Sequence, residues 1–306
     1  WPLYSAGGAT RDDRLPGCVP VNRPDVDGRM GRNTQKIPHS ALYTSATWWW
    51  GKFPCAEIVL PKGAMSLFWM VNTYSMLYRL LNPKKCSLKH TLVHRHALID
   101  ALLARSTCRQ VVEIAAGFSP RGCMVSADQA YRYFEVDLPE VIALKRKRLE
   151  ESVAGRVVLS RENFKLLVGD ITTLDFLLHF PKAPTFVITE GIMMYFKRDA
   201  QLAIWRNIAQ FLRVHGGEYV FDYIPLEDEP PRSLPGQLLS DLRQRLVKPP
   251  PPFAYDDRMR CDVVADLHTA GFARVEVIDS GEVSRTWPLP FPGVRTKVIV
   301  FHCSCE

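Results

Sequence analysis

The sequence predicts an α/β fold built on one largely parallel, doubly wound sheet with helices on both faces. Short apolar runs alternate with amphipathic ones from Val111 to Ile224, which is the pattern of repeated strand–helix units. A glycine turn follows the first of these runs, at Ala116-Gly117. Two further apolar runs come after the last long helical segment, and they fit an antiparallel hairpin that ends the sheet.

The composition is that of an ordinary globular protein. The chain has 306 residues, of which 47% are apolar and 23% charged, enough for one large domain or for a domain with an appendage. No apolar run reaches the roughly 18 residues needed to span a bilayer, so we expect no membrane partner. The first residue is Trp1, and we expect the chain to begin inside a longer one or after processing.

Cysteine usage and charge narrow the classes of function. The eight cysteines are scattered and form no C-x-x-C pair, so we expect reduced thiols, a cytoplasmic location and no metal site. The net charge of +7 is dispersed, with its densest cluster at residues 145–148. A solvated helix face explains this cluster more simply than attraction of an anionic substrate does. A nucleic-acid footprint would need a longer basic stripe with aromatic residues, and we expect no such partner.

The first sixty residues are expected to form an arm and lid before a main domain of residues 61–306. The first forty are rich in Gly, Pro, Arg and Asp and show no periodicity, as loops do. Trp48, Trp49 and Trp50 follow, and they either anchor the arm by burial or close over a hydrophobic substrate. Two helices come next, at 64–81 and 87–104, and Arg95 on the second is expected to point into the top of the sheet.

The strands and helices of the main domain follow in order. The expected strands are 111–115, 131–136, 164–168, 185–189, 218–224, a run ending at 278, and 296–302. The expected helices are 139–152, 174–179, one capped by Asp199 that runs to 214, and 259–270. The proline-rich segment 225–256 interrupts the alternation. An insertion at that point would lie at the carboxyl edge of the sheet, where open α/β folds bind ligands, so we expect a substrate lid there.

A glycine turn and a later acid predict a nucleotide-binding unit. The first strand breaks at Gly117, and the second ends on Asp137. Glycine lets the backbone approach a ligand, and the acid can take both hydroxyls of a ribose. The turn lacks the G-x-G-x-x-G spacing that holds a pyrophosphate. Because the next strands end in Asp170 and Glu190, the crevice suits a cofactor with a ribose, an adenine and an amino-acid tail but no phosphate, which is S-adenosylmethionine.

Four stretches resemble the leucine carboxyl methyltransferase family, including the bacterial polyketide O-methyltransferases related to it. They are VVEIAAGFSPRG (111–122), YFEVDLPEVIALKRK (133–147), LVGDITTLDF (167–176) and VITEGIMMYF (187–196). The resemblance covers roughly residues 92–224. It implies a Rossmann-like, seven-stranded class I methyltransferase fold, which agrees with the strand count above. It also implies S-adenosyl-L-methionine as cofactor and S-adenosyl-L-homocysteine as product.

The resemblance further implies roles for single residues. Arg95 would pair with the cofactor carboxylate, and Glu190 would bind the methionine ammonium. Gly117 would let the chain pass under the methionine part, and Asp137 would hold the ribose hydroxyls. The other cofactor-binding residues implied are Glu113, Arg121, Leu138, Asp170, Ile171 and Gly191.

The glycine turn departs from the G-x-G-x-D pattern of that family. Ala115 and Ala116 precede the glycine, and Ser119 stands where the acid is common. Arg121 is therefore expected to take over part of the tail recognition. Two implied roles have structural alternatives, since Glu113 could be a hydrogen-bonding residue of its strand and Asp170 a helix cap.

Methyl transfer depends more on the positioning of acceptor and methyl donor than on acid–base groups. A carboxylate acceptor is already ionised at neutral pH, whereas a phenol would benefit from a base. No evident base follows the fourth strand, which favours a carboxylate, although His39 or a histidine of the 90–96 group could fold over the site. Tyr195 is the nearest candidate for a catalytic group, with a pocket wall as its alternative role. The expected acceptor-binding residues are Trp49, Met194, Tyr195 and Tyr223.

Four functions remain open from the sequence. The first is methylation of a carboxylate or phenolic oxygen of a small natural product, and the second is methylation of a protein or peptide carboxyl group. In both, the acceptor carries a carboxylate or a hydroxyl. The third is a non-catalytic interaction module whose altered turn no longer binds the cofactor. The fourth and most distant is an NAD-dependent oxidoreductase.

Overall fold

The computed structural model describes residues 39–81, 86–173, 180–225, 258–284, 286–294 and 296–306 of the chain, within one compact unit of residues 36–306. Three expected elements lie outside the described residues: the first 38 residues of the arm, the short helix at 174–179, and nearly all of the insertion at 225–256. The expected boundary between arm and main domain at residue 60 stays a prediction.

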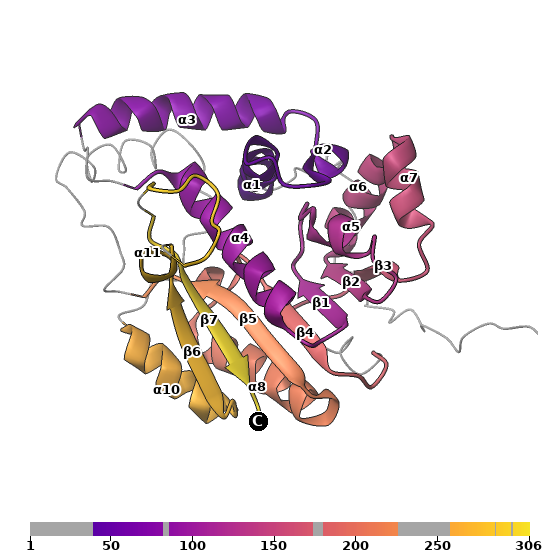
Figure 1. Cartoon of the computed structure of the whole chain (residues 1–306), viewed down its shortest axis with the longest axis vertical. Helices are drawn as coiled ribbons and strands as arrows, with labels where there is room; N and C mark the ends of the chain where they lie inside the picture. The colour runs from indigo at the N-terminus through magenta and orange to yellow at the C-terminus, as the bar shows by residue number, and fades with distance from the viewer. Residues whose placement is uncertain (1–38, 82–85, 174–179, 226–257, 285, 295) are drawn as a thin grey trace, which may run out of the picture. The chain divides into compact units, whose positions relative to one another are not determined.

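A seven-stranded sheet forms the centre of the fold (Figure 1). Its order is β3-β2-β1-β4-β5-β7-β6, and β7 runs antiparallel to both of its neighbours. This confirms the predicted doubly wound α/β class, the seven strands and the antiparallel pair at the end. The strands are β1 (Gln110–Ile114), β2 (Arg132–Asp137), β3 (Phe164–Val168), β4 (Thr185–Thr189), β5 (Gly217–Tyr223), β6 (Arg274–Asp279) and β7 (Ile299–Ser304).

The middle of the sheet lies at β1 and β4, because both strands are buried along their whole length. β1 pairs with β2 on one side and with β4 on the other, so that Val112 lies opposite Phe134 and Val187. The winding of the chain reverses at β1. Open α/β sheets bind ligands at such a switch point, outside the carboxyl ends of the strands. The strand order therefore places the predicted site where β1 and β4 end.

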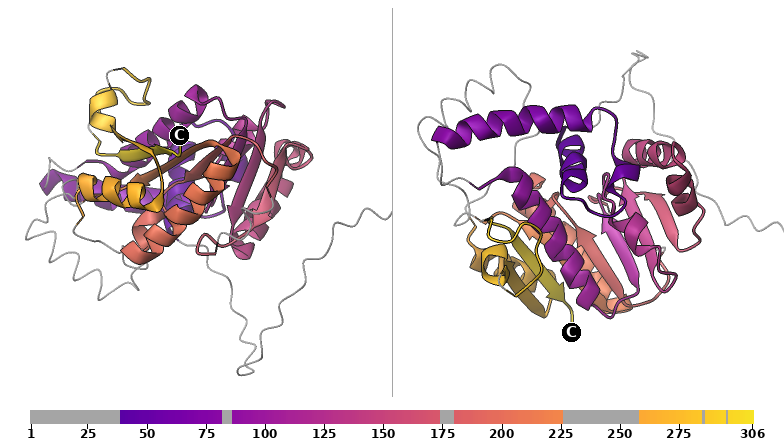
Figure 2. Two further views of the ribbon diagram at one scale, coloured as in Figure 1. Left: turned by 90° about the horizontal axis from the view of Figure 1, so that it is seen from below. Right: turned by 45° about the horizontal axis from the view of Figure 1, so that its top comes forward.

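Helices cover both faces of the sheet (Figure 2). On one face, Leu98 of α4 (Leu88–Arg105), Ile142 of α6 (Pro139–Glu150) and Val158 of α7 (Val153–Leu159) share one apolar cluster. On the other face, Trp205 of α8 (Arg198–His215) and Leu267 of α10 (Arg260–Ala270) belong to a second cluster. The shorter elements are α5 (Arg121–Val125), the 3-10 turn η2 (Met193–Tyr195) and α11 (Ser280–Val283). No described helix is long and apolar enough to cross a membrane.

Two expectations about the helices are wrong, and several helices were not predicted. Asp199 does not cap α8, because Lys197 holds the cap position and Asp199 lies in the first turn. The helix α7 was not predicted, and it begins after Ser152, whose side chain accepts a hydrogen bond from the backbone of Gly155. Lys145 does not lie on a solvated face, because it is buried. The helices at His39–Trp50, Ala56–Val59 and Ser280–Val283 and the turn η2 were not predicted either. The elements whose bounds were predicted, and which lie among the described residues, begin and end within three residues of those bounds.

Three N-terminal helices lie beyond the edge of the sheet where β1 and β2 end (Figures 1 and 2). They are α1 (His39–Trp50), α2 (Ala56–Val59) and α3 (Ala64–Leu81). Tyr43 of α1 packs on Phe68 of α3. Trp48 is buried against His96 of α4, with ring centres 4.8 Å apart, whereas Trp49 is 43% exposed. Trp48 therefore anchors α1 on the domain, and a lid role stays open for Trp49.

Candidate cofactor site

Acidic side chains lie at the ends of four of the five parallel strands. Asp137 is the last residue of β2, Asp170 and Glu190 follow β3 and β4, and Asp222 lies one residue before the end of β5. The carboxyl ends of parallel strands share one edge of the sheet, so these carboxylates lie along the same edge. Asp222 was not among the predicted residues, although it follows the same rule of an acid at the end of a strand.

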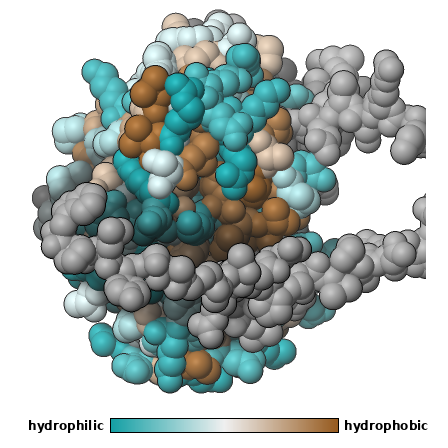
Figure 3. Space-filling model, turned by 90° about the vertical axis from the view of Figure 1, so that its right-hand side faces the viewer, coloured by the Kyte–Doolittle hydropathy of each residue, from teal (hydrophilic) through white to brown (hydrophobic). Residues whose placement is uncertain are grey.

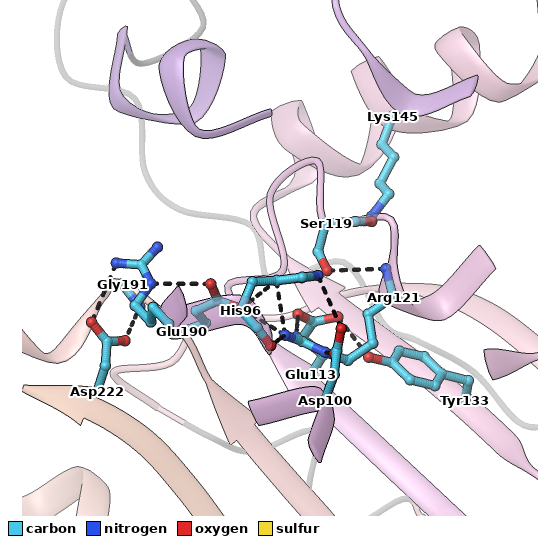
Figure 4. A network of polar contacts seen from close by, with 11 residues as sticks. His96, Asp100, Glu113, Ser119, Arg121, Tyr133, Lys145, Glu190, Gly191 and Asp222 are labelled. Atoms are coloured by element: carbon cyan, nitrogen blue, oxygen red, sulfur yellow. Dashed lines mark hydrogen bonds and ion pairs between the residues drawn. The ribbon is translucent and has the colours of Figure 1, made fainter. Parts of the chain in front are cut away.

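Arg95 joins two of these carboxylates, as expected of a side chain that points into the top of the sheet. Its Nε donates to Glu190 Oε1 at 3.0 Å, and its Nη1 donates to Asp222 Oδ2 at 3.2 Å. Asp222 Oδ1 accepts from the backbone N–H of Gly191 at 2.5 Å (Figure 4). The Nη2 group of Arg95 has no hydrogen-bond partner among the described residues. It is therefore available for a ligand carboxylate.

Glu190 is buried among cationic and polar side chains. Its Oε2 accepts from Arg121 Nη2 at 2.8 Å and lies 2.9 Å from His96 Nδ1. Burial alone would raise the pKa of Glu190, but His96, Arg121 and Arg95 outweigh burial and hold this pKa well below its ordinary value. Glu190 is thus an ionised carboxylate in dry surroundings, which suits the binding of an ammonium group.

Arg121 is the centre of a buried network beneath Glu190 (Figure 4). Its side chain is 0% exposed, and it donates to Glu113 Oε1 and to Asp100 Oδ1 at 2.5 Å each. The Tyr133 hydroxyl donates to Glu113 Oε2 at 2.7 Å. Glu113 therefore has the partners of a hydrogen-bonding residue within its strand. The burial of Arg121 and its full set of partners weigh against contact between this side chain and a cofactor tail.

His96 fills the space between the N-terminal helices and Glu190. Its ring packs between Trp48 and Phe53, with ring centres 4.8 Å and 4.7 Å away. It is the member of the 90–96 group that folds over this edge, whereas His94 bonds to the C-terminal part of the chain. No spacing rule distinguishes the two histidines, because the packing of α1 on α4 decides which of them meets Glu190.

The glycine turn lies next to open space and is held by Asp137. Gly117 N–H donates to Asp137 Oδ2 and Leu138 N–H to Asp137 Oδ1, both at 2.7 Å. Each carboxylate oxygen keeps a lone pair for a further donor, as two ribose hydroxyls require. Ala115 and Gly117 have φ values of 55° and 54°, and a Cβ at Gly117 would meet nothing within 4 Å. The turn thus keeps a left-handed shape although alanine stands at its start, at a cost of about 1–2 kcal/mol.

Apolar side chains flank Asp137 and Asp170. Leu138 and Val168 are exposed at the ends of neighbouring strands. Ile171, three residues after Val168, is buried. Figure 3 shows apolar surface framed by hydrophilic side chains on the side of the molecule that lies at the right in Figure 1. Asp170 is exposed, and its Oδ1 accepts from the N–H and the hydroxyl of Thr172 at 2.8 Å each, as a cap would. These apolar surfaces are suited to the faces of an adenine ring.

The four residues expected to bind the acceptor lie in three places. Tyr223 is buried at the end of β5, where Arg258 Nη2 donates to its hydroxyl at 3.1 Å. Met194 and Tyr195 are half-buried in η2, directly after Glu190 and its glycine. Trp49 lines a surface cavity of about 570 Å³ formed by residues 49–57. Met194 and Tyr195 are thus the two that the chain places next to a predicted cofactor-binding residue.

The groups along this edge fit the parts of S-adenosylmethionine. Arg95 Nη2 is open to a carboxylate, Glu190 to an ammonium and Asp137 to ribose hydroxyls. The open space at Gly117 leaves room for the chain that joins these parts. The described residues contain no group of His, Cys, Asp or Glu side chains that could hold a metal ion.

Two sequence matches fall on the same family. The family model "Leucine carboxyl methyltransferase" matches residues 72–209. Leucine carboxyl methyltransferase 1 of Eremothecium gossypii is 29% identical over 125 residues, which is 34% of this chain and 38% of that protein. This chain thus spans less than two fifths of its relative. Both matches support the leucine carboxyl methyltransferase family, and neither distinguishes a polyketide-type branch.

Solved structures with a similar fold are more distant. PigF with SAH shares 16% identity and a TM-score of 0.45, over 68% of this chain and 54% of that chain. A putative O-methyltransferase from Nostoc punctiforme shares 15% identity and a TM-score of 0.46, over 70% of this chain and 56% of that chain. The fold of this chain is established by its own sheet order, not by these likenesses.

Proposed function

We propose that this chain, whose middle part matches the leucine carboxyl methyltransferase family, is an S-adenosyl-L-methionine-dependent methyltransferase. The observation that carries the proposal is the row of groups along one sheet edge that fit an amino-acid tail and a ribose: Arg95, Glu190 and Asp137. When bound, the cofactor supplies a methyl group already activated by a sulfonium. The protein then has mainly to position the acceptor and to exclude water.

Each of these residues has one task in the proposal. Arg95 binds the tail carboxylate through Nη2, while its other nitrogens stay on Glu190 and Asp222. Glu190 binds the ammonium. Asp137 accepts from the ribose hydroxyls, with both of its oxygens already oriented by backbone N–H groups. Because the sheet fixes these groups before the ligand arrives, little ordering is needed on binding.

We infer that the acceptor oxygen belongs to a carboxylate, so that the product is a methyl ester. His96 is poorly placed to act as a base, because it is buried and its Nδ1 already contacts Glu190. Tyr195 offers a phenol hydroxyl, which can donate a hydrogen bond but is a weak proton acceptor. A carboxylate acceptor needs no base at all. The family that matches the chain agrees with this choice.

Two acceptor classes fit a carboxylate. The sequence favours a small natural product, by its resemblance to polyketide-type enzymes. The name of the curated relative, leucine carboxyl methyltransferase 1, favours a peptide or protein carboxyl group. A peptide ending in a free leucine carboxylate, its amidated twin and a panel of small carboxylic acids separate the two by mass spectrometry. An added methyl group that mild alkali removes identifies an ester, whereas an ether would survive.

Calorimetry tests the cofactor directly. We expect S-adenosylmethionine and S-adenosylhomocysteine to bind and NAD not to bind. Asp137→Ala should weaken binding roughly a hundredfold, because it removes two hydrogen bonds to a charged group. Asp128→Ala, in the exposed turn before β2, is the matched control. If folded wild-type protein binds neither sulfur compound, the proposed function is refuted; if Asp137→Ala binds normally, the ribose assignment is wrong.

A further inference from the structure

Lys145 is a buried lysine within a basic stretch of α6. Its neighbours at 146–148 are exposed or half-exposed, whereas Lys145 is 0% exposed. The helix begins two residues after Asp137, so the side chain of Lys145 returns two turns later toward β2 and the glycine turn. Its Nζ donates to the backbone oxygen of Ser119 at 2.7 Å (Figure 4) and forms an ion pair with Glu135.

Glu135 lies in the middle of β2 and is as deeply buried as Lys145. Lys145 is its cationic partner, and no second donor reaches its carboxylate from the described residues. Gly122 makes room for the pair at the start of α5, because a Cβ there would collide with Glu135 Oε1. A buried ion pair is weak evidence for stability, since desolvation offsets much of its attraction. The location of this pair therefore calls for another explanation.

The pair holds one end of the glycine turn, and Asp137 holds the other. Asp137 binds the N–H of Gly117, and Lys145 binds the carbonyl of Ser119 two residues later. Between them, Ser119 N–H donates to the carbonyl of Ala116 at 2.9 Å and closes the turn. Both anchors come from the same short stretch of chain, the end of β2 and the middle of α6. The shape of the turn thus depends on Lys145 as directly as on Asp137.

We propose that the Lys145–Glu135 pair is a positioning device for the cofactor, which holds the turn at 115–119 in its binding shape while Glu135 is ionised. This inference rests on the proposed function, because the turn has to bind S-adenosylmethionine for its shape to matter. Neither side chain touches the cofactor in this scheme. Both act through the backbone of the turn, and they are positioning residues rather than catalytic ones.

Glu135 changes its ionisation near neutral pH. The pKa of Glu135 is raised to about 7. Burial is the main cause and Glu113 on β1 adds to it, whereas Lys145 on α6 lowers this pKa. Tyr133 and Asp137 on the same strand and Cys123 on α5 are the other titratable groups that face it. Protonated Glu135 no longer attracts the ammonium of Lys145. We therefore expect cofactor affinity to fall as the pH is lowered through about 7.

Calorimetry with S-adenosylmethionine over a pH series tests the inference on the full chain. Lys145→Met should weaken binding about tenfold above pH 7, since it removes a hydrogen bond from a charged donor. Lys147→Met is the matched control on the exposed side of the same helix and should bind as the wild type does. Glu135→Gln mimics the protonated acid. It should bind at the low-pH affinity of the wild type throughout, with a flatter pH profile.

The pH profile separates positioning from a merely structural role. The amino group of the cofactor also titrates, but it does so with every variant, so the difference between wild type and Glu135→Gln isolates Glu135. If Lys145→Met does not fold, the Glu135→Gln profile alone decides. Wild-type affinity and an unchanged pH profile in Glu135→Gln would overturn the inference and leave the proposed function standing. Failure of the folded wild type to bind would overturn both.

Discussion

Replacing Arg121 with methionine tests whether the buried network holds the candidate site together. Arg121 pairs with Asp100, Glu113 and Glu190, and its own side chain is 0% exposed. Methionine keeps much of the side-chain volume but leaves three carboxylates without this cation. Removing one partner of a buried pair costs about 3–5 kcal/mol. Asp100 is 21% exposed and keeps some water, so the expected loss is about 3–5 kcal/mol and not three times that amount.

Urea unfolding followed by circular dichroism measures this loss in the free energy of unfolding. The expected loss is a large share of the roughly 5–15 kcal/mol that stabilises a typical domain. Lys62→Met is the control, because Lys62 pairs with Glu151 at 3.6 Å while its own side chain is 86% exposed. Exposed pairs contribute about 0–1 kcal/mol. If the two variants lose equal stability, the network around Arg121 does not have the energetic role that its burial implies.

Three further predictions concern the same edge of the sheet. Glu190→Gln should be less stable than the wild type at neutral pH and should converge with it in acid. The lowered pKa of Glu190 stabilises the fold fully above the ordinary pKa of ~4.3, and this contribution is lost as the pH falls through the pKa of the folded state. Parallel stability curves from urea unfolding across pH would contradict the pairing. Gly191→Ala should weaken S-adenosylmethionine binding about tenfold in calorimetry, because φ is 71° there and a Cβ would lie 2.9 Å from Arg95 Nη2; normal affinity would argue against Arg95 as the carboxylate partner. Trp48→Ala should cost about 3–5 kcal/mol and the exposed Trp49→Ala only about 0.5 kcal/mol in thermal unfolding, and equal losses would show that Trp48 does not anchor α1.

The carboxylates of the site were predictable because a local rule places them. An acid directly after a buried strand has to lie at the carboxyl edge of a parallel sheet, and Asp137, Asp170 and Glu190 follow this rule. Asp222 follows it as well and could have been found by extending the rule to β5. The strand order was predictable for a similar reason, since alternating strands and helices leave few topologies open.

The partners of these carboxylates could not be predicted in the same way. His96 and Arg121 meet Glu190 only because α1, α4 and α5 pack together over one edge, and no sequence spacing encodes that packing. Lys145 is different, because a signal existed. Ile142, Lys145 and Leu149 share the buried stripe of α6 at helical spacing, so this spacing could have shown that Lys145 is buried, whereas the density of charge led to the wrong expectation of a solvated face.

The network at the site carries more negative than positive charge. Among the described residues, four carboxylates face two guanidiniums and the ring of His96, and these groups are Asp100, Glu113, Glu190, Asp222, Arg95, Arg121 and His96. Uncompensated buried charge is costly, and burial raises the pKa of Asp222 even though Arg95 lies beside it. S-adenosylmethionine has an ammonium and a sulfonium against one carboxylate, so it would bring net positive charge to this point, and its binding would stabilise the fold. NAD would bring two phosphates to the same edge and add to the excess. The charge balance therefore favours a sulfonium cofactor independently of the glycine turn.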